Sequence, residues 1–271
     1  MPDNLIGTIP QLGYGTWNHE GDEAYNATLW ALEAGYRHID TAQGYRNEQE
    51  VGRAIRDSGV PRGDIHLTTK IAPENYGPGK VMQSSRQSLD DLGVDQVDLL
   101  LLHWPSPHNE YPLESYISQF AEVHDAGMAK MIGVSNFTIP LLKEAKALLG
   151  ERMITTNQCE IHVFMQNRPI VDYCRSIGMP MTAYSPLARG LVRGDPALLE
   201  IGKAHAATEG QIAIAFLLAE GHIAIPSSSN KERIISNFAA RDIVLSADEL
   251  QRLRGLERGQ RLVNGAWVPV W

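Results

Sequence analysis

Two patterns of hydrophobic and polar positions alternate along the whole chain. Short apolar runs occupy residues 12–16, 36–40, 65–70, 97–103, 131–135, 156–160, 181–185 and 223–227. Each run has the length and the nearly continuous apolar character of a strand that is buried on both faces. Several of the segments between the runs repeat apolar residues every three or four positions, as Val51, Ala54 and Ile55 do, which is typical of a helix with one buried face.

Two helix starts are marked by capping sequences. Thr208 stands three residues before Gln211, and Ser246 stands three residues before Glu249. A hydroxyl residue followed at that spacing by Glu or Gln can satisfy free backbone N–H groups reciprocally, so both places are predicted helix starts. One further helix is indicated by an apolar stripe at Leu141, Leu142, Ala145, Leu148 and Leu149.

Eight strand-then-helix units predict the fold class, a single α/β (β/α)8 TIM barrel that comprises residues 1–271. Residues 1–11 form a short N-terminal extension, and an irregular C-terminal loop with Trp267 and Trp271 follows Arg258. The alternative is an open, doubly wound sheet. That fold would place GxGxxG after the first strand, where this chain has GYGTWN.

Net charge and cysteine content narrow the function classes. The formal net charge is −8, which argues against nucleic acid and anionic membranes as partners because both attract positively charged surfaces. The two cysteines, Cys159 and Cys174, lack metal or redox spacing, and no signal peptide or membrane-spanning run is visible. We expect a cytoplasmic monomer with reduced thiols and no bound metal.

Polar residues end three consecutive predicted strands. Asp40 ends the second, Lys70 the third and His103 the fourth, while Tyr45 follows on the loop after Asp40. In a barrel these side chains converge on one mouth. An Asp–Lys pair or a core histidine alone is more often structural, but the four together favour a catalytic site.

These four residue types suit acid catalysis by a phenol. A tyrosine ordinarily has a pKa near ~10, and a neighbouring ammonium group lowers it by stabilising the phenolate. Asp40 would keep Lys70 charged, and neutral His103 would hold a carbonyl oxygen beside Tyr45. The arrangement suits protonation of an oxygen that becomes alkoxide-like as hydride arrives.

A second candidate site lies at residues 226–237. The run SSSNKERIISN combines three hydroxyl side chains, Arg233 and a predicted helix start. Hydroxyls, helix N-terminal N–H groups and a guanidinium together bind anions. A serine-rich helix cap without a ligand is the alternative.

Seven motifs in order resemble the aldo-keto reductase family over almost the whole chain. They are GYRHIDTAQGYRNEQEVG, TTK, LLLLHWPSP, IGVSNFTIPLL, TNQCEIH, YSPLARG and IPSSSNKERIISN. Within the family the chain is most similar to bacterial 2,5-diketo-D-gluconate reductases of the B type, which also reduce methylglyoxal. The resemblance implies reduction of aldehydes and ketones, such as keto sugars and methylglyoxal-like carbonyl compounds, with NADPH, and more weakly with NADH.

The resemblance also implies roles for individual residues. Tyr45 would be the proton donor, Lys70 and Asp40 its support and His103 the group that orients the carbonyl, with Trp17 and Trp104 lining the substrate pocket. Cofactor contacts are implied at Thr16, Trp17, Asp40, Ser135, Asn136, Gln158, Tyr184, Ser185, Leu187, Ser227, Ser228, Arg233 and Asn237. Tyr184 would stack on the nicotinamide, and Ser135, Asn136 and Gln158 would bind its carboxamide.

Three positions depart from the family pattern, and one of them is Val163, which replaces a usual proline. Ser227 replaces a common lysine, which leaves fewer cations for a phosphate. Ala72 replaces a usual aromatic residue, which predicts a wider pocket.

Other functions have their own signatures. A catalytically weak, NADPH-binding regulatory protein would share the fold, as potassium-channel β-subunits do. A barrel glycosidase would need two carboxylates across the mouth, for which Asp40 and Glu160 are candidates, although Asp40 has its lysine. The spacing of Tyr76 and Lys80 matches the YxxxK pattern of another reductase class, but Gly-Pro-Gly between them opposes the helix that this pattern needs.

Overall fold

The structure is a computed structural model that describes residues 5–266 and 268–269. Its main sheet contains β3 (Tyr14–Gly15), β4 (His38–Asp40), β5 (His66–Ile71), β6 (Val97–Leu102), β7 (Ala129–Ser135), β8 (Ile154–Glu160), β9 (Met181–Tyr184) and β10 (Ile223–Ala224). The helices are α1 (Gly21–Ala34), α2 (Glu48–Asp57), α3 (Lys80–Leu92), α4 (Leu113–Asp125), α5 (Ile139–Leu149), α6 (Arg168–Ser176), α7 (Pro196–Ala204), α8 (Glu209–Ala219), α9 (Lys231–Ala239) and α10 (Ala247–Arg254).

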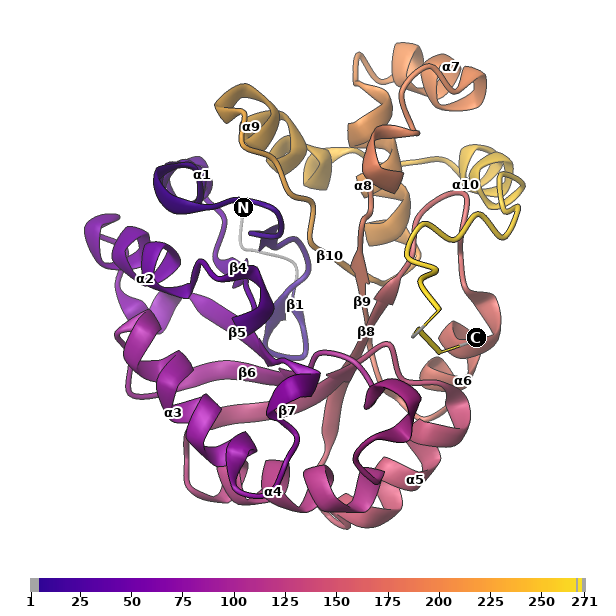
Figure 1. Ribbon diagram of the computed structural model, residues 1–271. Coiled ribbons are helices and arrows are strands. Elements are labelled where there is room, and N and C mark those ends of the chain that lie inside the picture. Colours follow the sequence, from indigo (N-terminus) through magenta and orange to yellow (C-terminus); the bar gives the residue numbers. More distant parts are fainter. Residues whose placement is uncertain (1–4, 267, 270–271) are drawn as a thin grey trace.

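The strands are parallel, pair in chain order and close into a barrel surrounded by helices (Figure 1). Closure joins β3 to β10, where Gly13 N–H donates to Ala224 O at 2.9 Å and Gly15 N–H to Pro226 O at 3.0 Å. A Cβ on Gly15 would lie 2.9 Å from the Ile225 carbonyl oxygen, so this close approach requires glycine. The predicted (β/α)8 barrel is confirmed.

The N-terminal extension closes the end of the barrel at which the strands begin. Its antiparallel strands are β1 (Leu5–Ile6) and β2 (Ile9–Pro10). Ile9 is buried against Leu99, Leu101 and Ile223. These side chains form a small apolar cluster separate from the larger core under the helices, so the barrel interior is packed at this end and its polar mouth lies at the other.

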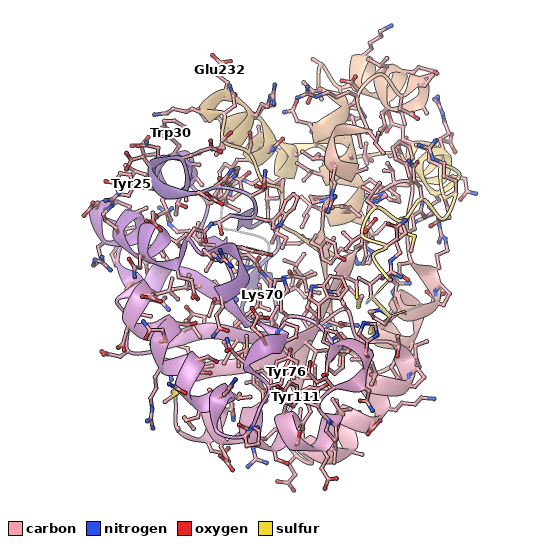
Figure 2. The ribbon with its side chains drawn as sticks, viewed as in Figure 1. Tyr25, Trp30, Lys70, Tyr76, Tyr111 and Glu232 are labelled. Carbon is pink, nitrogen blue, oxygen red and sulfur yellow. The ribbon has the colours of Figure 1, made fainter. Side chains whose placement is uncertain are left out.

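The helices pack apolar faces on the outside of the barrel. Val51, Ala54 and Ile55 of α2 are buried as their spacing predicted, and in α5 Leu142 and Leu149 are buried while Leu148 is exposed. Figure 2 shows the contrast between Lys70, in the middle of the molecule, and side chains on the outer helices, such as Tyr25, Trp30 and Glu232.

Both predicted capping boxes are present. In each, the hydroxyl oxygen accepts a backbone N–H while the Gln or Glu side chain accepts the N–H of the capping residue. Thr208 and Gln211 start α8, and Ser246 and Glu249 start α10. The pattern located both starts because it describes local hydrogen bonds.

Every predicted run overlaps a strand, but several limits differ. The first and last strands are shorter than predicted, with two residues each in β3 and β10. Apolar residues continue to Ile225, but Pro226 has no N–H to extend the ladder. β7 begins two residues early, at Ala129, which pairs with Val97 of β6, and within this added part Lys130 Nζ donates to Asp98 Oδ1 at 2.7 Å.

The chain after α10 forms the predicted irregular tail. Arg258 N–H and Gln260 N–H both donate to Phe164 O, at 3.3 and 3.0 Å, so the tail packs on the loop after β8. Trp267 and Trp271 lie outside the described residues.

Helices α2 and α3 approach closely at Gly52. A Cβ on this residue would lie 2.2 Å from Leu92 O, at the end of α3, so Gly52→Ala would force the helices apart. We expect it to lower the free energy of unfolding by about 1–3 kcal/mol, a typical cost of overpacking. Urea denaturation measures this. Gly63→Ala is the matched control, because a Cβ there meets nothing within 4 Å. Equal stability of both variants would contradict the close contact.

Glu48 is a buried carboxyl group between α2, β5 and α3. It accepts hydrogen bonds from Thr69 Oγ1 at 2.5 Å and Ser88 Oγ at 3.1 Å, and burial raises its pKa to about 7. The unfolded chain releases this proton near ~4.5, so the raised pKa makes the fold lose stability as pH rises from about 4.5 to 7.

Glu48→Gln removes this titration. The free energy of unfolding of the variant relative to wild type should therefore rise by roughly 3 kcal/mol between pH ~5 and pH ~8. Urea denaturation at both pH values measures the change. Glu50→Gln, on the same helix, controls for loss of a carboxylate. If the difference in the free energy of unfolding between wild type and variant did not change with pH, Glu48 would not titrate in this range.

Candidate active site

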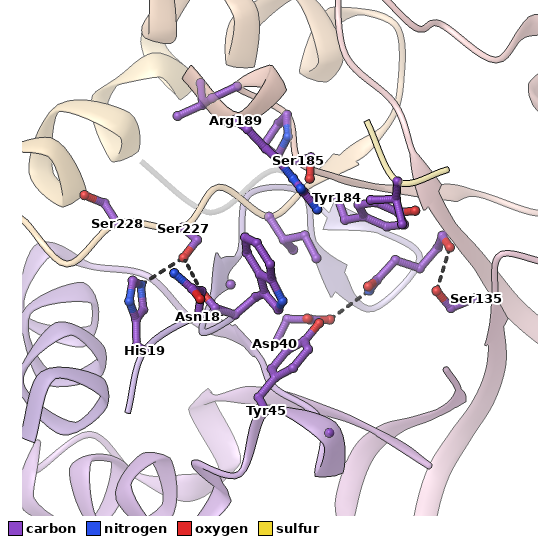
Figure 3. Close-up of a pocket in the computed structure, with 18 of the residues that line it drawn as sticks. Asn18, His19, Asp40, Tyr45, Ser135, Tyr184, Ser185, Arg189, Ser227 and Ser228 are labelled. Carbon is purple, nitrogen blue, oxygen red and sulfur yellow. Dashed lines mark hydrogen bonds between the residues drawn. The ribbon is translucent and has the colours of Figure 1, made fainter. Parts of the chain in front are cut away.

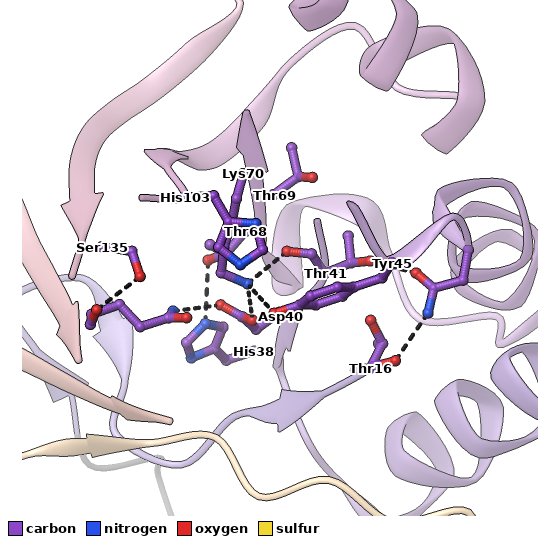
Figure 4. Close-up of polar contacts among 12 residues, drawn as sticks. Thr16, His38, Asp40, Thr41, Tyr45, Thr68, Thr69, Lys70, His103 and Ser135 are labelled. Carbon is purple, nitrogen blue, oxygen red and sulfur yellow. Dashed lines mark hydrogen bonds and ion pairs between the residues drawn. The ribbon is translucent and has the colours of Figure 1, made fainter. Parts of the chain in front are cut away.

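Four predicted catalytic side chains meet at the barrel mouth. Asp40 ends β4, Lys70 lies in β5, and His103 directly follows β6. Tyr45 ends the short 3-10 helix η1 (Gln43–Tyr45), which follows β4. Successive parallel strands therefore supply three of the groups and the adjoining loop the fourth (Figure 4).

The Lys70 ammonium is the centre of this cluster. Its Nζ donates to Asp40 Oδ1 at 2.5 Å, to Thr41 O at 2.8 Å and to Tyr45 Oη at 3.3 Å. Lys70 and Asp40 are both almost fully buried. All three ammonium protons therefore have acceptors, which a buried cation requires.

Opposing influences set the pKa values of Lys70 and Tyr45. Burial lowers the pKa of Lys70, but the attractions of Asp40 and Tyr45 outweigh it and the net direction is upward, so the ammonium stays charged. Burial raises the pKa of Tyr45, and the attraction of Lys70 only partly opposes this rise. The expected lowering by Lys70 is present, but the net shift is upward because packing around the hydroxyl outweighs it.

His103 is held neutral next to the phenol. Burial, followed by the nearby Lys70 charge, lowers its pKa well below the ordinary value. Its ring meets that of Tyr45 edge-on, with centroids 5.5 Å apart and an angle of 77°. Neutral imidazole can donate one hydrogen bond, so this face offers a phenol O–H and an imidazole N–H together.

Polar side chains from the opposite strands complete the network. Gln158 Nε2 donates to Asp40 Oδ2 at 2.8 Å, and Tyr184 Oη donates to Asn136 Oδ1 at 2.9 Å. Asn136 Nδ2 donates to His103 O at 3.1 Å. Asn136 and Ser185 have left-handed backbones, with φ of 64° and 51°. Non-glycine residues in this region are uncommon and cluster at functional sites.

An open cavity of about 570 Å³ lies over this network (Figure 3). Most of the predicted site residues line it: Trp17, Asp40, Tyr45, His103, Trp104, Ser135, Asn136, Gln158, Tyr184, Ser185, Leu187, Ser227, Ser228 and Arg233. Thr16 and Asn237 are buried outside its lining, and Lys70 lies beneath Tyr45. The Thr16 hydroxyl is buried, so its predicted contact with a cofactor stays a prediction.

The far end of the cavity contains the predicted anion site. Asn230 caps α9 by accepting Arg233 N–H at 2.9 Å, which confirms the expected helix start. Arg233 is exposed and borders the cavity beside Ser227 and Ser228. Hydroxyls, a guanidinium and a helix N-terminus therefore meet at one end of the cavity.

Some cavity residues were missed by the sequence analysis. His19 bonds Ser227 Oγ through Nε2 and Glu23 Oε1 through Nδ1, both at 2.9 Å. Arg189 has a left-handed backbone, and its Cζ lies 5.0 Å from the centre of the Trp17 ring. His19 carried no motif signal, whereas Arg189 lies within YSPLARG and could have been found there.

Two other expectations concern residues near the mouth. Ala72 is buried and is not among the residues that line the cavity, and its N–H donates to Gln43 Oε1 at 2.9 Å, so its effect on pocket width stays a prediction. Tyr76 is buried, and its hydroxyl donates to Trp104 O at 2.7 Å. Gly79 has φ of 74°, which breaks any helix between Tyr76 and Lys80 as expected.

Within residues 5–266 and 268–269, no group of three or more His, Cys, Asp or Glu side chains is arranged to hold a metal ion. No helix in that part of the chain has the length and apolar character needed to cross a bilayer.

Known proteins are similar in sequence to this chain over the whole length of the barrel. The chain is 40% identical over 265 residues to methylglyoxal reductase DkgB of Salmonella typhi, covering 97% of this chain and 99% of the relative. It is 36% identical over 298 residues to glycerol 2-dehydrogenase (NADP(+)) of Saccharomyces cerevisiae, covering 98% and 94%.

Solved structures agree in fold. A crystal structure provisionally described as 2,5-diketo-D-gluconic acid reductase B matches with a TM-score of 0.94 and 39% identity, over 97% of this chain and 94% of that one. An aldo-keto reductase from a Medee basin deep-sea metagenome library matches with a TM-score of 0.88 and 35% identity, over 94% of each chain.

These matches confirm the resemblance that the ordered motifs indicated. The family model described as "Aldo/keto reductase family" matches residues 11–258, which include every strand of the barrel and each of the four predicted catalytic residues. A barrel that carries these motifs at its strand ends, and that aligns with reductases over nearly its full length, is an oxidoreductase and belongs to the aldo/keto reductase family.

Proposed function

We propose that this protein reduces small aldehydes and ketones, methylglyoxal among them, to alcohols with NADPH. The observation that carries the proposal is the buried Asp40–Lys70 pair bonded to Tyr45 beneath an open cavity. Methylglyoxal and NADP(+) are named for relatives that cover almost the whole chain, which supports the choice of substrate class and cofactor.

The residues around the cavity fit a nicotinamide dinucleotide. Arg233 and the α9 N-terminus suit phosphate at one end, and Ser227 and Ser228 add hydroxyls. Near the four predicted catalytic residues, the Tyr184 ring borders the same cavity and suits a planar heterocycle. Ser135, Asn136 and Gln158 suit the carboxamide by their polar groups. Bound NADPH would supply hydride to the carbonyl carbon of the substrate.

Tyr45 supplies the proton in the proposed reaction. The raised pKa keeps its phenol protonated before reaction, so the proton is available to the carbonyl oxygen. As the oxygen gains negative charge it takes the Tyr45 proton, and Lys70 Nζ, 3.3 Å away, stabilises the phenolate left behind. The Asp40 contact keeps Lys70 charged throughout.

His103 positions the substrate in this proposal. Its neutral ring borders the cavity next to Tyr45 and can donate a hydrogen bond to the same carbonyl oxygen. A protonated imidazole there would repel Lys70 and is disfavoured by burial. Trp17 and Trp104 supply apolar walls that displace water from a small substrate.

Tyr45→Phe tests the function directly. Loss of the proton donor should lower kcat with methylglyoxal by at least ~10²-fold while NADPH still binds. NADPH oxidation and fluorescence titration measure the two quantities. Tyr76→Phe is the matched control, since Tyr76 does not line the cavity, and should change kcat no more than a few-fold. Near-normal turnover by Tyr45→Phe would contradict the assignment, and wild-type protein that binds NADPH without turning over any carbonyl compound would favour a regulatory role.

Arg233→Ala tests how the cofactor is chosen. A charge-assisted contact to the 2′-phosphate is worth roughly 1.5–3 kcal/mol, so the variant should bind NADPH about ten- to a hundredfold more weakly and NADH almost unchanged. Fluorescence titration with both cofactors measures this.

Lys231→Ala is the control for Arg233→Ala. This cation lies two residues away on α9, pairs with Glu33 at 2.9 Å and does not line the cavity. Equal losses of affinity for NADPH and NADH in Arg233→Ala would show that Arg233 does not bind the 2′-phosphate. Ser227→Lys should tighten NADPH binding, because it adds a cation next to the same site.

A further inference from the structure

A second buried carboxylate lies near the mouth and belongs to no step of the proposed reaction. Glu160 ends β8 and is fully buried. Its Oε1 accepts from His162 Nε2 at 3.1 Å and from Leu262 N–H at 2.6 Å, and its Oε2 accepts from Val263 N–H at 2.9 Å. Two of its three donors therefore come from the C-terminal tail, about a hundred residues away along the chain.

His162 is oriented to support this contact. Phe164 N–H donates to His162 Nδ1 at 3.3 Å, so in a neutral ring the proton lies on Nε2 and points at Glu160. Burial raises the pKa of Glu160, but His162 and the two tail N–H groups outweigh it and the net direction is downward. The carboxylate is therefore ionised at neutral pH, and its hydrogen bonds to the tail are charge-assisted.

The tail residue at this contact also borders the active-site cavity. Val263 lines the cavity together with Trp17, Tyr45 and Trp104. In Figure 1 the tail runs from α10 past the ends of β9 and β8. The earlier contacts of Arg258 and Gln260 with Phe164 O bring the tail to β8, and Glu160 then holds Leu262 and Val263, of which Val263 borders the cavity.

We propose that Glu160 is a positioning residue that fixes the C-terminal tail at Leu262 and Val263, so that the Val263 side chain forms an apolar wall of the substrate pocket and limits the size of the carbonyl compound accepted. The inference rests on the proposed function for its substrate. Its structural part, the anchoring of the tail, does not. When its anchor is removed, the tail can move to other positions, whereas residues at the ends of strands are held in place by the sheet.

Hydrogen exchange tests the anchor without reference to activity. Glu160→Gln removes the charge and turns one acceptor into a donor that faces backbone N–H groups. The amides of Leu262 and Val263 should exchange at least ~10-fold faster than in wild type, as expected when a charge-assisted bond worth about 1.5–3 kcal/mol is lost. Glu249→Gln is the matched control: Glu249 also accepts a backbone N–H, from Ser246 at 2.7 Å, but does not line the cavity.

Substrate selectivity tests the wall. With NADPH, the ratio of kcat/KM for phenylglyoxal to that for methylglyoxal should rise by at least ~10-fold in Glu160→Gln, a change that loss of a small apolar contact can produce. Val263→Ala shortens the wall and leaves the anchor in place, so it should raise the same ratio while the Leu262 amide stays protected. The double variant should show about the shift of the larger single variant, because both changes act through one wall.

Each outcome decides a separate point. Unchanged exchange of the two amides in Glu160→Gln would overturn the anchor, and an unchanged ratio in Val263→Ala would overturn the wall. Equal loss of kcat/KM for both substrates in Glu160→Gln and Glu249→Gln would indicate general destabilisation instead. Wild-type protein that reduces no carbonyl compound would refute the proposed function, and the exchange experiment would still decide the anchor.

Discussion

The buried ion pair of Lys70 and Asp40, with 2.5 Å between Nζ and Oδ1, is the interaction on which the rest of the mouth depends. Burying two charges is costly unless nearly every donor and acceptor is satisfied. Thr41 O and Tyr45 Oη take the other Lys70 protons, and Gln158 Nε2 binds the second Asp40 oxygen. Because these partners come from different strands, the charge pair can persist only if the barrel is closed in this register.

Hydrogen bonds between polar side chains of several strands form one connected network at the mouth. The Gln158–Asp40 bond joins β8 to the end of β4 across the barrel, and Asn136 connects Tyr184 to the backbone of His103. Of the predicted catalytic groups, Asp40 and Lys70 lie in strands and His103 directly follows one, whereas Val263 above them lies on the C-terminal tail. The proposed chemistry and the proposed choice of substrate therefore depend on different parts of the fold.

Local signals predicted the parts of the molecule that local rules govern. Strand ends placed Asp40, Lys70 and His103, and capping boxes placed the starts of α8 and α10. Contacts between distant segments could not be predicted in the same way, because nothing in the sequence around Val263 indicates that it meets Glu160. The net pKa direction of Tyr45 also depends on how tightly the fold packs around its hydroxyl.

The closing seam of the barrel has a further consequence. β3 and β10 contribute two residues each, whereas β7 and β8 have seven, and the pairing at the seam is the single parallel bridge of Leu12 with Ala224. Directly above it, Ser227 Oγ reaches across to Trp17 O at 3.2 Å, and both residues line the cavity. A ligand that touches both residues spans this seam, so its binding free energy adds to the free energy of closure. Occupancy of the pocket and integrity of the barrel are thus thermodynamically linked.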